Sequence, residues 1–322
     1  MRYAEALNRA LHEEMARDER VCVIGEDVGI YGGVFKVTKG LRERFGDLRV
    51  RDTPISEQAM TGLAIGAAMV GRRPVLEIMY IDFLTLCLDQ LVNQASIVHY
   101  IWAGQASLPF VLRTQGGAGA GAAAQHSKSL DALVAHVPGL KVVAPATPAD
   151  ASGLLVAAIR DPNPVVFLEH KLLYNTTGEV PEGDHVVPIG QAHVAREGTD
   201  ITIVASSKMT LDALAAAETL AAEGIDAEVV DLRTLRPLDR ETIARSVRKT
   251  NRALVVNEGW TTGGFGAELS AVIMEDAFDW LDGPVRRLGT ADRPIPYSLP
   301  LEQAAVPDAA AITRAARLTL AG

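Results

Sequence analysis

The strongest constraint on the fold of this chain is a regular alternation of short, β-branched apolar runs with longer segments of helical periodicity. The runs interpreted as buried strands are Val21–Ile24, Pro74–Met79, Pro109–Leu112, Leu140–Ala144 and Val165–Leu168. The segments of helical period between them are Ala4–Ala16, Gln58–Val70, Phe83–Val98 and Ala149–Ile159. Strands separated by helices pair in parallel through right-handed crossovers. The first half is therefore expected to be a doubly wound α/β domain with a parallel sheet.

The alternation is interrupted between residues 175 and 200, where Gly, Pro and Thr crowd together without periodicity. It then restarts with strands and helices at Ile201–Ala205, Thr210–Glu223, Ala227–Leu232, Arg240–Val247, Ala253–Val256 and Gly266–Asp276. A chain of 322 residues exceeds the typical domain size of about 150. The sequence predicts a larger α/β domain over 1–180, a linker over 181–199 and a smaller α/β domain over 200–322.

Charge and cysteine content exclude several classes of function. The chain has 31 Lys and Arg against 40 Asp and Glu, a net charge of −9, which argues against a nucleic-acid partner. Cys22 and Cys87 are the only cysteines, and they lie far apart in the sequence. Neither a disulfide framework nor a Cys-x-x-Cys metal or redox site can be built from them. A reducing compartment is the simplest expectation.

The hydropathy pattern gives no sign of a targeting or membrane segment. The first residues enter an amphipathic pattern directly, without an apolar core or a small-residue cleavage site. Glu77, Asp82 and Asp89 interrupt the longest apolar stretches, well short of the about 20 residues that a spanning helix requires. We expect a cytoplasmic protein with no membrane partner.

Two glycine clusters invite a nucleotide-binding interpretation, which the spacing does not support. The cluster Gly116–Gly121 has no third glycine to complete Gly-x-Gly-x-x-Gly, because Ala122 and Ala124 stand where it would fall. The cluster Gly263–Gly266 fails in the same way, and the chain contains neither a phosphate loop nor a Gly-x-Ser-x-Gly elbow. Neither an NAD-binding domain nor a stand-alone hydrolase is expected.

Three polar residues lie at positions where α/β proteins commonly place ligand-binding or catalytic side chains. Glu26 ends an apolar strand, Glu57 precedes a helix of small and apolar residues, and His126 ends the glycine and alanine loop. Loops at the carboxyl ends of strands are where α/β proteins bind ligands. Each residue also has a plain structural interpretation. Glu57 fits a partner for the helix dipole with Ser56 as the cap, and His126 fits a solvated surface histidine.

A series of short blocks runs in order from about Tyr3 to the C-terminus. They are Gly25–Val28, Asp52–Glu57, Glu77–Met79 with Phe83, Asp89–Gln90, Ala124–Ser127, Gly139–Val143 and Ile159–Pro164. Together they resemble the β subunit of the thiamine-diphosphate-dependent decarboxylating component of 2-oxo acid dehydrogenase complexes. The resemblance implies a doubly wound, parallel-sheet pyrimidine-binding domain followed by a smaller α/β domain like the transketolase C-terminal domain.

The same resemblance implies a cofactor that two chains share. Family members hold the thiamine diphosphate pyrimidine on the β side, and hold the diphosphate with Mg²⁺ mainly on the α side. The present sequence has no Gly-Asp-Gly motif followed by an Asn pair, which is the family's diphosphate signature. We therefore expect a catalytic β subunit that is active only with an α subunit, in an α₂β₂ heterotetramer.

The resemblance also assigns roles to single residues. Glu57 matches the carboxyl that hydrogen-bonds the pyrimidine ring nitrogen and so helps the cofactor's own amino group to take up a proton. Phe83 matches the aromatic residue that packs on the pyrimidine, although ordinary helix core remains an alternative, and Met79 is expected to line the same pocket. His126 matches a histidine that orients substrate or protonates the lipoyl sulfur. Glu26 matches a member of an acidic chain between paired active sites.

A loop near residue 160 matches a structural K⁺ site of the family. Its oxygens would come from Ala158, Ile159, Asp161 and Asn163, with a carbonyl from Phe110. Oxygen-only ligation suits a hard cation.

The function implied is oxidative decarboxylation of a 2-oxo acid, with reductive acylation of a lipoyl group on the acyltransferase component. Pyruvate is the expected substrate. The segment around Met79 looks more like pyruvate- or acetoin-type relatives than branched-chain ones, which tend to carry a polar residue at that position. An acetoin dehydrogenase β subunit is the next alternative, followed by a branched-chain 2-oxo acid dehydrogenase β subunit. A fourth interpretation is a non-catalytic subunit that docks the acyltransferase through its C-terminal domain.

Overall fold

The computed structural model describes residues 1–322, which form two compact units. Unit 1 comprises Met1–Gly116 and Leu133–Ile189, and unit 2 comprises Gly117–Ala132 and Gly190–Gly322. The boundary at residue 189 lies within the expected linker 181–199. The sequence suggested an uninterrupted domain over 1–180, whereas the segment Gly117–Ala132 groups with unit 2. Its backbone is hydrogen-bonded to side chains of the C-terminal half, as described below.

The parallel sheet of unit 1 follows the predicted strands closely. Its strands are β1 (Val21–Gly25), β2 (Val50–Asp52), β3 (Arg73–Ile78), β4 (Val111–Gly116), β5 (Lys141–Val143) and β6 (Val165–His170). They lie in the order β5-β6-β4-β3-β1-β2, and their pairs are parallel. Gly25 pairs with Glu77, so β1 and β3 end at the same edge of the sheet. This edge carries Glu26 and Met79, each just beyond a strand.

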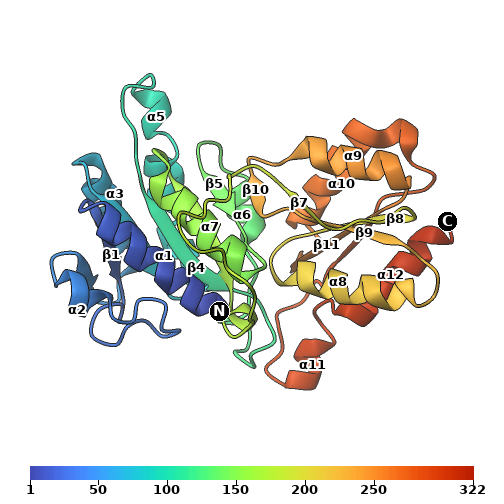
Figure 1. Ribbon diagram of the computed structural model, residues 1–322, viewed down its shortest axis with the longest axis horizontal. Helices are drawn as coiled ribbons and strands as arrows, with labels where there is room; N and C mark the ends of the chain where they lie inside the picture. The colour runs from blue at the N-terminus through green and yellow to red at the C-terminus, as the bar shows by residue number, and fades with distance from the viewer. The chain divides into compact units, whose positions relative to one another are not determined.

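Helices α1 (Tyr3–Arg17) and α7 (Pro148–Arg160) lie side by side in unit 1 (Figure 1). The apolar face of α1 includes Tyr3, Leu7 and Leu11, which are spaced by about one helical turn and fully buried. Arg160 at the end of α7 donates to the buried Glu14 carboxylate at 2.7 Å. The unit also contains α2 (Leu41–Phe45), α3 (Glu57–Met69) and η3 (Lys171–Leu173). Helix α6 (Asp131–Ala135) begins in unit 2 and ends in unit 1.

The prediction of one α-helix over Phe83–Val98 is wrong. This region consists of the 3₁₀-helix η1 (Ile81–Cys87), α4 (Leu88–Gln90), the π-helix η2 (Leu91–Ala95) and α5 (Val98–Ile101). The apolar spacing did not reveal the hydrogen-bond pattern of the backbone. The Ser96 amide bonds to the Leu91 carbonyl at 2.9 Å, one residue beyond the α-helical partner. Phe83 consequently lies in a 3₁₀ turn.

The sheet of unit 2 is mixed. Its strands are β7 (His193–Arg196), β8 (Ile201–Ala205), β9 (Ala227–Asp231), β11 (Ala253–Trp260) and β12 (Arg286–Thr290), in the order β12-β11-β8-β9-β7. The pairs are parallel except that β7 is antiparallel to β9. Strand β7 was not predicted, because its polar sequence lies in the segment interpreted as a linker. A short strand, β10 (Thr234–Arg236), follows β9.

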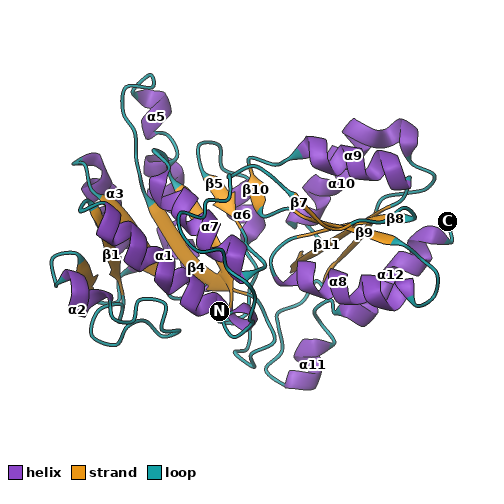
Figure 2. Ribbon diagram, viewed as in Figure 1, coloured by secondary structure: helices purple, strands orange, loops and turns teal.

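Helices cover both faces of the unit 2 sheet. Figure 2 shows α8 (Lys208–Ala221) and α12 (Ala309–Leu320) on one face, with α9 (Arg240–Thr250) and α10 (Phe265–Ala277) on the other. Alanine-rich faces of α8 and α12 enter one core with the strands, which permits close packing. The shorter helices are η4 (Phe278–Trp280) and α11 (Leu299–Gln303). None of the helices combines the length and the apolar character needed to span a membrane.

A buried ion network ties the central strands of unit 1 together. Arg113 on β4 is 1% exposed and donates to Glu77 on β3 at 2.8 Å and to Glu169 on β6 at 2.7 and 2.9 Å. The Tyr174 hydroxyl also donates to Glu169 at 2.7 Å. Burial alone would lower the pKa of Arg113, but Glu169 and Glu77 raise it above its usual value. These contacts fix the β3 end of the sheet edge.

Replacing the central cation should therefore destabilise unit 1 strongly. We expect Arg113→Met to lower the free energy of unfolding by about 3–5 kcal/mol, because it leaves two buried carboxylates unpaired. Arg51→Met on exposed β2 is the control and should cost less than about 0.5 kcal/mol. Urea unfolding followed by circular dichroism measures both. Equal losses in the two variants would show that the network does not stabilise the fold.

Candidate active site

The clearest candidate for chemistry is the side chain that begins α3. Glu57 is 7% exposed, and its carboxylate has no hydrogen bond or ion pair with the rest of the chain. Its backbone carbonyl accepts from the Thr61 hydroxyl at 2.7 Å and from the Cys87 thiol at 3.6 Å. Ser56, suggested as the helix cap, makes no side-chain cap bond. The backbone of Glu57 is thus held while its carboxylate is left for another group.

The position of Glu57 explains how a buried carboxylate is tolerated there. The N-terminus of a helix carries partial positive charge, and α3 is long enough, at 13 residues, for this effect to act. The structure places Glu57 in the first turn of α3, where the dipole interpretation from the sequence requires it to lie. The carboxylate oxygens have no hydrogen-bond partner in the chain and keep limited access to solvent. Such a group is typical of a site that a ligand completes.

Glu26 lies close enough to Glu57 for their charges to interact. It follows β1, and its Oε1 atom is buried without a hydrogen-bond partner. Burial raises the pKa of Glu26, and the charges of Glu57 and Asp27 raise it further. Burial also raises the pKa of the Cys87 thiol to about 11, against the lowering effect of its hydrogen bond to Thr61. The structure thus brings together two of the predicted site residues, each with a carboxylate atom available to a ligand.

Phe83 and Met79 belong to the same region of unit 1. The Cys87 thiol lies 3.8 Å from the Phe83 carbonyl and 3.6 Å from that of Glu57, so one side chain links η1 to the start of α3. The Phe83 ring packs edge-on against Tyr80 at a centroid distance of 6.3 Å. Phe83 and Met79 are both half-buried, and Met79 directly follows β3. Their predicted contacts with a pyrimidine ring stay predictions.

His126 lies in unit 2, in a loop rather than in a helix, as expected. The loop is closed by a bond from the Gly117 amide to the Lys128 carbonyl at 3.0 Å. The Lys128 ammonium donates to the Ala124 carbonyl at 2.7 Å, which braces the loop from inside. His126 is half-buried. Because Glu57 belongs to unit 1, a joint role for the two residues stays a prediction.

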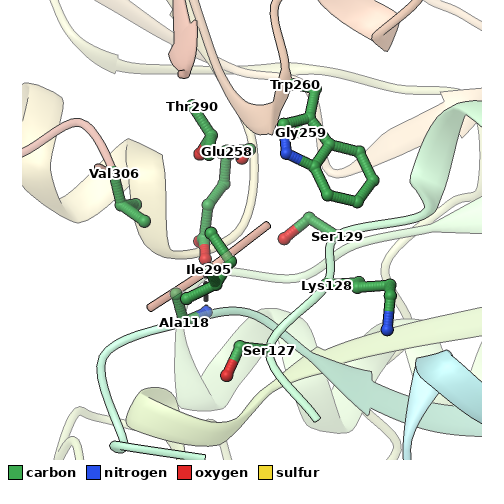
Figure 3. Close-up of a pocket in the computed structure, with 10 residues that line it drawn as sticks. All are labelled: Ala118, Ser127, Lys128, Ser129, Glu258, Gly259, Trp260, Thr290, Ile295 and Val306. Carbon is green, nitrogen blue, oxygen red and sulfur yellow. Dashed lines mark hydrogen bonds between the residues drawn. The ribbon is translucent and has the colours of Figure 1, made fainter. Parts of the chain in front are cut away.

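Two carboxylates that sequence reasoning missed hold the glycine-rich part of this loop. Glu258 accepts from the Ala118 amide at 2.7 Å, as Figure 3 shows. Glu302 is fully buried and accepts from the Gly119 and Gly121 amides at 2.8 and 2.9 Å. Positive φ angles of 97° and 67° at these glycines allow their amides to converge on one carboxylate. The alternating glycines indicate a backbone segment whose amides bind an anion. Here that anion is the Glu302 carboxylate of the same chain.

The predicted K⁺ site lies at the C-terminal end of α7, which includes Ala158 and Ile159, and in the loop after it, and it offers mainly carbonyl and amide oxygens. The Asn163 Oδ1 atom is buried without a partner, which is an oxygen free for a cation. Asp161 accepts from the Asn163 amide at 2.9 Å and pairs with Lys141. No cluster of His, Cys, Asp and Glu side chains suited to a metal occurs in the chain. The donor set therefore fits a weakly bound hard cation better than zinc.

Other bonds already use part of that donor set. Arg73 donates to the Ile159 carbonyl at 2.8 Å and to the Asp161 carbonyl at 3.2 Å. The Phe110 carbonyl accepts from the Val165 amide at 2.9 Å. Each carbonyl oxygen has a second lone pair, so a cation would share these atoms with their present donors.

The coupling between the two acidic side chains can be measured directly. We expect the folded-state pKa of Glu26 to lie above its usual value of 4.5, and Glu57→Gln to lower it, because one negative neighbour disappears while burial remains. Carboxyl-carbon NMR titration gives the pKa, assigned by the signal that Glu26→Gln removes. Glu43→Gln, an exposed site on α2, should leave it unchanged. A Glu26 pKa at or below 4.5 would contradict this assignment.

The sign of the resulting pH dependence follows from linkage. A raised pKa means that the folded chain binds the Glu26 proton more tightly than the unfolded chain does. The contribution of Glu26 to stability is therefore fully present below pH 4.5 and is lost as the pH rises through the folded-state pKa. Glu26→Gln should remove that part of the pH dependence.

Comparison with known proteins agrees with this geometry. The family model described as "Transketolase, pyrimidine binding domain" matches residues 1–177, and "Transketolase, C-terminal domain" matches residues 190–312. A solved structure described as a split gene transketolase, an inactive β4 tetramer, is similar with a TM-score of 0.82 and 26% identity. The match covers 100% of this chain and 98% of that one. The predicted fold class is confirmed.

Curated relatives are similar over nearly their whole length. The pyruvate dehydrogenase E1 component subunit beta-2, mitochondrial, of Oryza sativa subsp. japonica is 50% identical over 321 residues, covering 98% of this chain and 85% of the relative. The pyruvate dehydrogenase E1 component subunit beta of Rickettsia felis is 47% identical over 313 residues, covering 97% and 96%. The chain therefore belongs to the family of pyruvate dehydrogenase E1 component beta subunits, which joins a transketolase pyrimidine-binding domain to a transketolase C-terminal domain.

Proposed function

We propose that this chain is the catalytic β subunit of a thiamine-diphosphate-dependent pyruvate dehydrogenase. With an α subunit it decarboxylates pyruvate oxidatively and transfers the acetyl group to a lipoyl group on the acyltransferase component. The observation that carries the proposal is the buried Glu57 carboxylate, which begins α3 without an internal partner beside the orphaned Oε1 of Glu26. The names of relatives about half identical in sequence support the substrate.

The residues present fit the pyrimidine half of thiamine diphosphate. When bound, this cofactor supplies the electron sink that lets a 2-oxo acid lose carbon dioxide. Glu57 would hold the pyrimidine ring nitrogen through a hydrogen bond, and Phe83 and Met79 would supply apolar walls. We assign the diphosphate and Mg²⁺ mainly to the α subunit, because this sequence lacks the family's diphosphate signature.

Glu26 and Glu57 lie close enough for their charges to interact. Glu26 keeps its proton to a higher pH than an exposed carboxyl does, because burial and the Glu57 charge both oppose its ionisation. Glu26 can accept or release a proton at Oε1, which fits its proposed place in an acidic chain between paired sites.

His126 acts after substrate has bound, in our proposal. A half-buried imidazole on a braced loop can hydrogen-bond a substrate oxygen or give a proton to the lipoyl sulfur. Both roles require the ring to stay at a fixed position relative to its loop. The network around Ala118, Gly119 and Gly121 provides that restraint.

Assembly into an α₂β₂ heterotetramer agrees with the surface of α3. Ile55 just before the helix and Val70 just after it are 80% and 83% exposed, and Leu63 within it is 52% exposed. Apolar side chains gathered on one exposed segment are typical of subunit contacts. We also propose a cytoplasmic location. The name of the Rickettsia felis relative gives no organelle, whereas the name of the rice relative includes the word mitochondrial.

Reconstitution tests the catalytic role. The chain mixed with its α partner, thiamine diphosphate and Mg²⁺ should decarboxylate pyruvate, and Glu57→Gln should lower kcat by about 10²–10⁴-fold, the range expected for loss of a positioned acid or base. Glu43→Gln should leave kcat unchanged. A Glu57→Gln complex with full activity would refute the assignment.

The same preparation separates the alternatives. Assembly of the wild-type complex without any cofactor-dependent turnover would favour a non-catalytic assembly subunit. A panel of pyruvate, acetoin and branched-chain 2-oxo acids names the substrate, and we expect the highest kcat/KM with pyruvate. A higher kcat/KM with acetoin would identify an acetoin dehydrogenase β subunit. A higher kcat/KM with a branched-chain acid would identify a branched-chain 2-oxo acid dehydrogenase β subunit.

We also propose that K⁺ binds at the C-terminal end of α7. Its ligands are Asn163 Oδ1, the Asp161 side chain and the carbonyls of Phe110, Ala158 and Ile159. The orphaned Asn163 oxygen supports this site. K⁺ should raise the thermal midpoint of the wild-type chain relative to tetramethylammonium at equal ionic strength, because a cation bound only by the folded state stabilises it. Asn163→Ala should abolish the difference. An equal response of both proteins would place K⁺ elsewhere.

A further inference from the structure

We propose that Glu258 and Glu302 are positioning residues for the reaction, which hold the glycine-rich loop so that His126 is presented in one place. The inference rests on the function proposed above, because it concerns the step that His126 serves. Glu258 belongs to β11 and Glu302 to α11, and both contact the loop within unit 2. Neither residue was a candidate from the sequence.

The loop needs such support because its own sequence provides little order. Residues 116–124 consist entirely of glycine and alanine, and Gly117, Gly119 and Gly121 all have positive φ. Glycine loses more backbone freedom on ordering than any other residue. A histidine at the end of such a segment would sample many positions if nothing bound the backbone before it. Catalytic groups work best when their position is fixed in advance.

Carboxylates are effective restraints for this backbone. Glu302 uses one oxygen for Gly119 and the other for Gly121, so a single side chain sets two amides that are two residues apart. Glu258 fixes the adjacent Ala118 amide (Figure 3). Bonds from amides to an ionised acceptor are stronger than neutral ones. The full burial of Glu302 keeps water from competing for these amides.

Strand β11 fastens both ends of the segment that carries His126. Glu258 holds Ala118 at the start, and the neighbouring Asn257 donates to Asp131 at the end, with a distance of 2.7 Å in each case. Between these points the Ser127 hydroxyl, next to His126, is buried without a partner, which indicates a tightly enclosed backbone. Two consecutive residues of a strand thus determine where the loop begins and ends.

Glu302 is the better residue to test, because it binds two amides of the loop and Glu258 binds one. In Glu302→Gln, the amide nitrogen faces an N–H group and cannot accept its hydrogen bond, while size and shape are kept. In the reconstituted complex we expect acetylation of the lipoyl domain to slow by about 10-fold to 10²-fold, because small displacements of catalytic groups have effects of this size. Glu268→Gln on α10, whose exposed carboxylate has no bond, should leave the rate unchanged.

A double-mutant cycle separates positioning from general stability. If Glu302 acts through His126, then Glu302→Gln should change the rate less than about twofold once His126→Ala is present, since coupled residues are not additive. An equal loss in both backgrounds would overturn the proposal, because it would show that Glu302 acts independently of His126. Glu258→Gln follows the same design and covers the case in which Glu302→Gln fails to fold.

Hydrogen exchange on the assembled complex supplies a readout that does not depend on activity. Glu302→Gln should speed exchange of the amides in 118–128 by about tenfold or more while β11 keeps its protection. Unchanged exchange in the loop would overturn the proposal. If the wild-type complex exchanges as expected but turns over no 2-oxo acid, then the proposed function fails and the anchoring of the loop stands.

Discussion

A carboxylate buried at the start of α3 without an internal partner is the constraint on which this account of the protein depends. The helix dipole makes the charge of Glu57 tolerable there, and its hydrogen bonding is left to a ligand or to solvent, because no group of the chain bonds to the carboxylate. Glu26 adds a second orphaned oxygen and a second charge that resists ionisation. Two acidic groups in such surroundings are expensive for the fold, so a site that uses them is the simplest physical reason for their presence.

The rest of unit 1 holds this pair in place. Parallel strands β1 and β3 end together, which brings the residues that follow them to one edge, and the Arg113 network secures the β3 side of that edge. Cys87 joins η1 to the carbonyl of Glu57, so the apolar wall and the acid are positioned by a common contact. In unit 2 the arrangement is different, because the buried Glu302 accepts hydrogen bonds from two amides of a loop that has no regular structure.

Local patterns predicted the regular parts of the fold well and the irregular parts poorly. Strands such as Ile201–Ala205 were found because continuous apolar runs mark buried parallel strands. The helix over Phe83–Val98 was wrong, since apolar spacing does not distinguish 3₁₀, α and π patterns over such short stretches. Glu26 and Glu57 could be proposed from their places at a strand end and a helix start. Glu302 could not, because its partners are backbone amides about 180 residues away in the chain.

The most direct test is an experimental structure of the reconstituted α and β complex with thiamine diphosphate bound. The account predicts that a Glu57 carboxylate oxygen lies within hydrogen-bond distance of the pyrimidine ring nitrogen, at about 2.6–3.2 Å. A pyrimidine bound elsewhere, or a Glu57 carboxylate that faces solvent or bonds only to protein groups, would contradict the central claim.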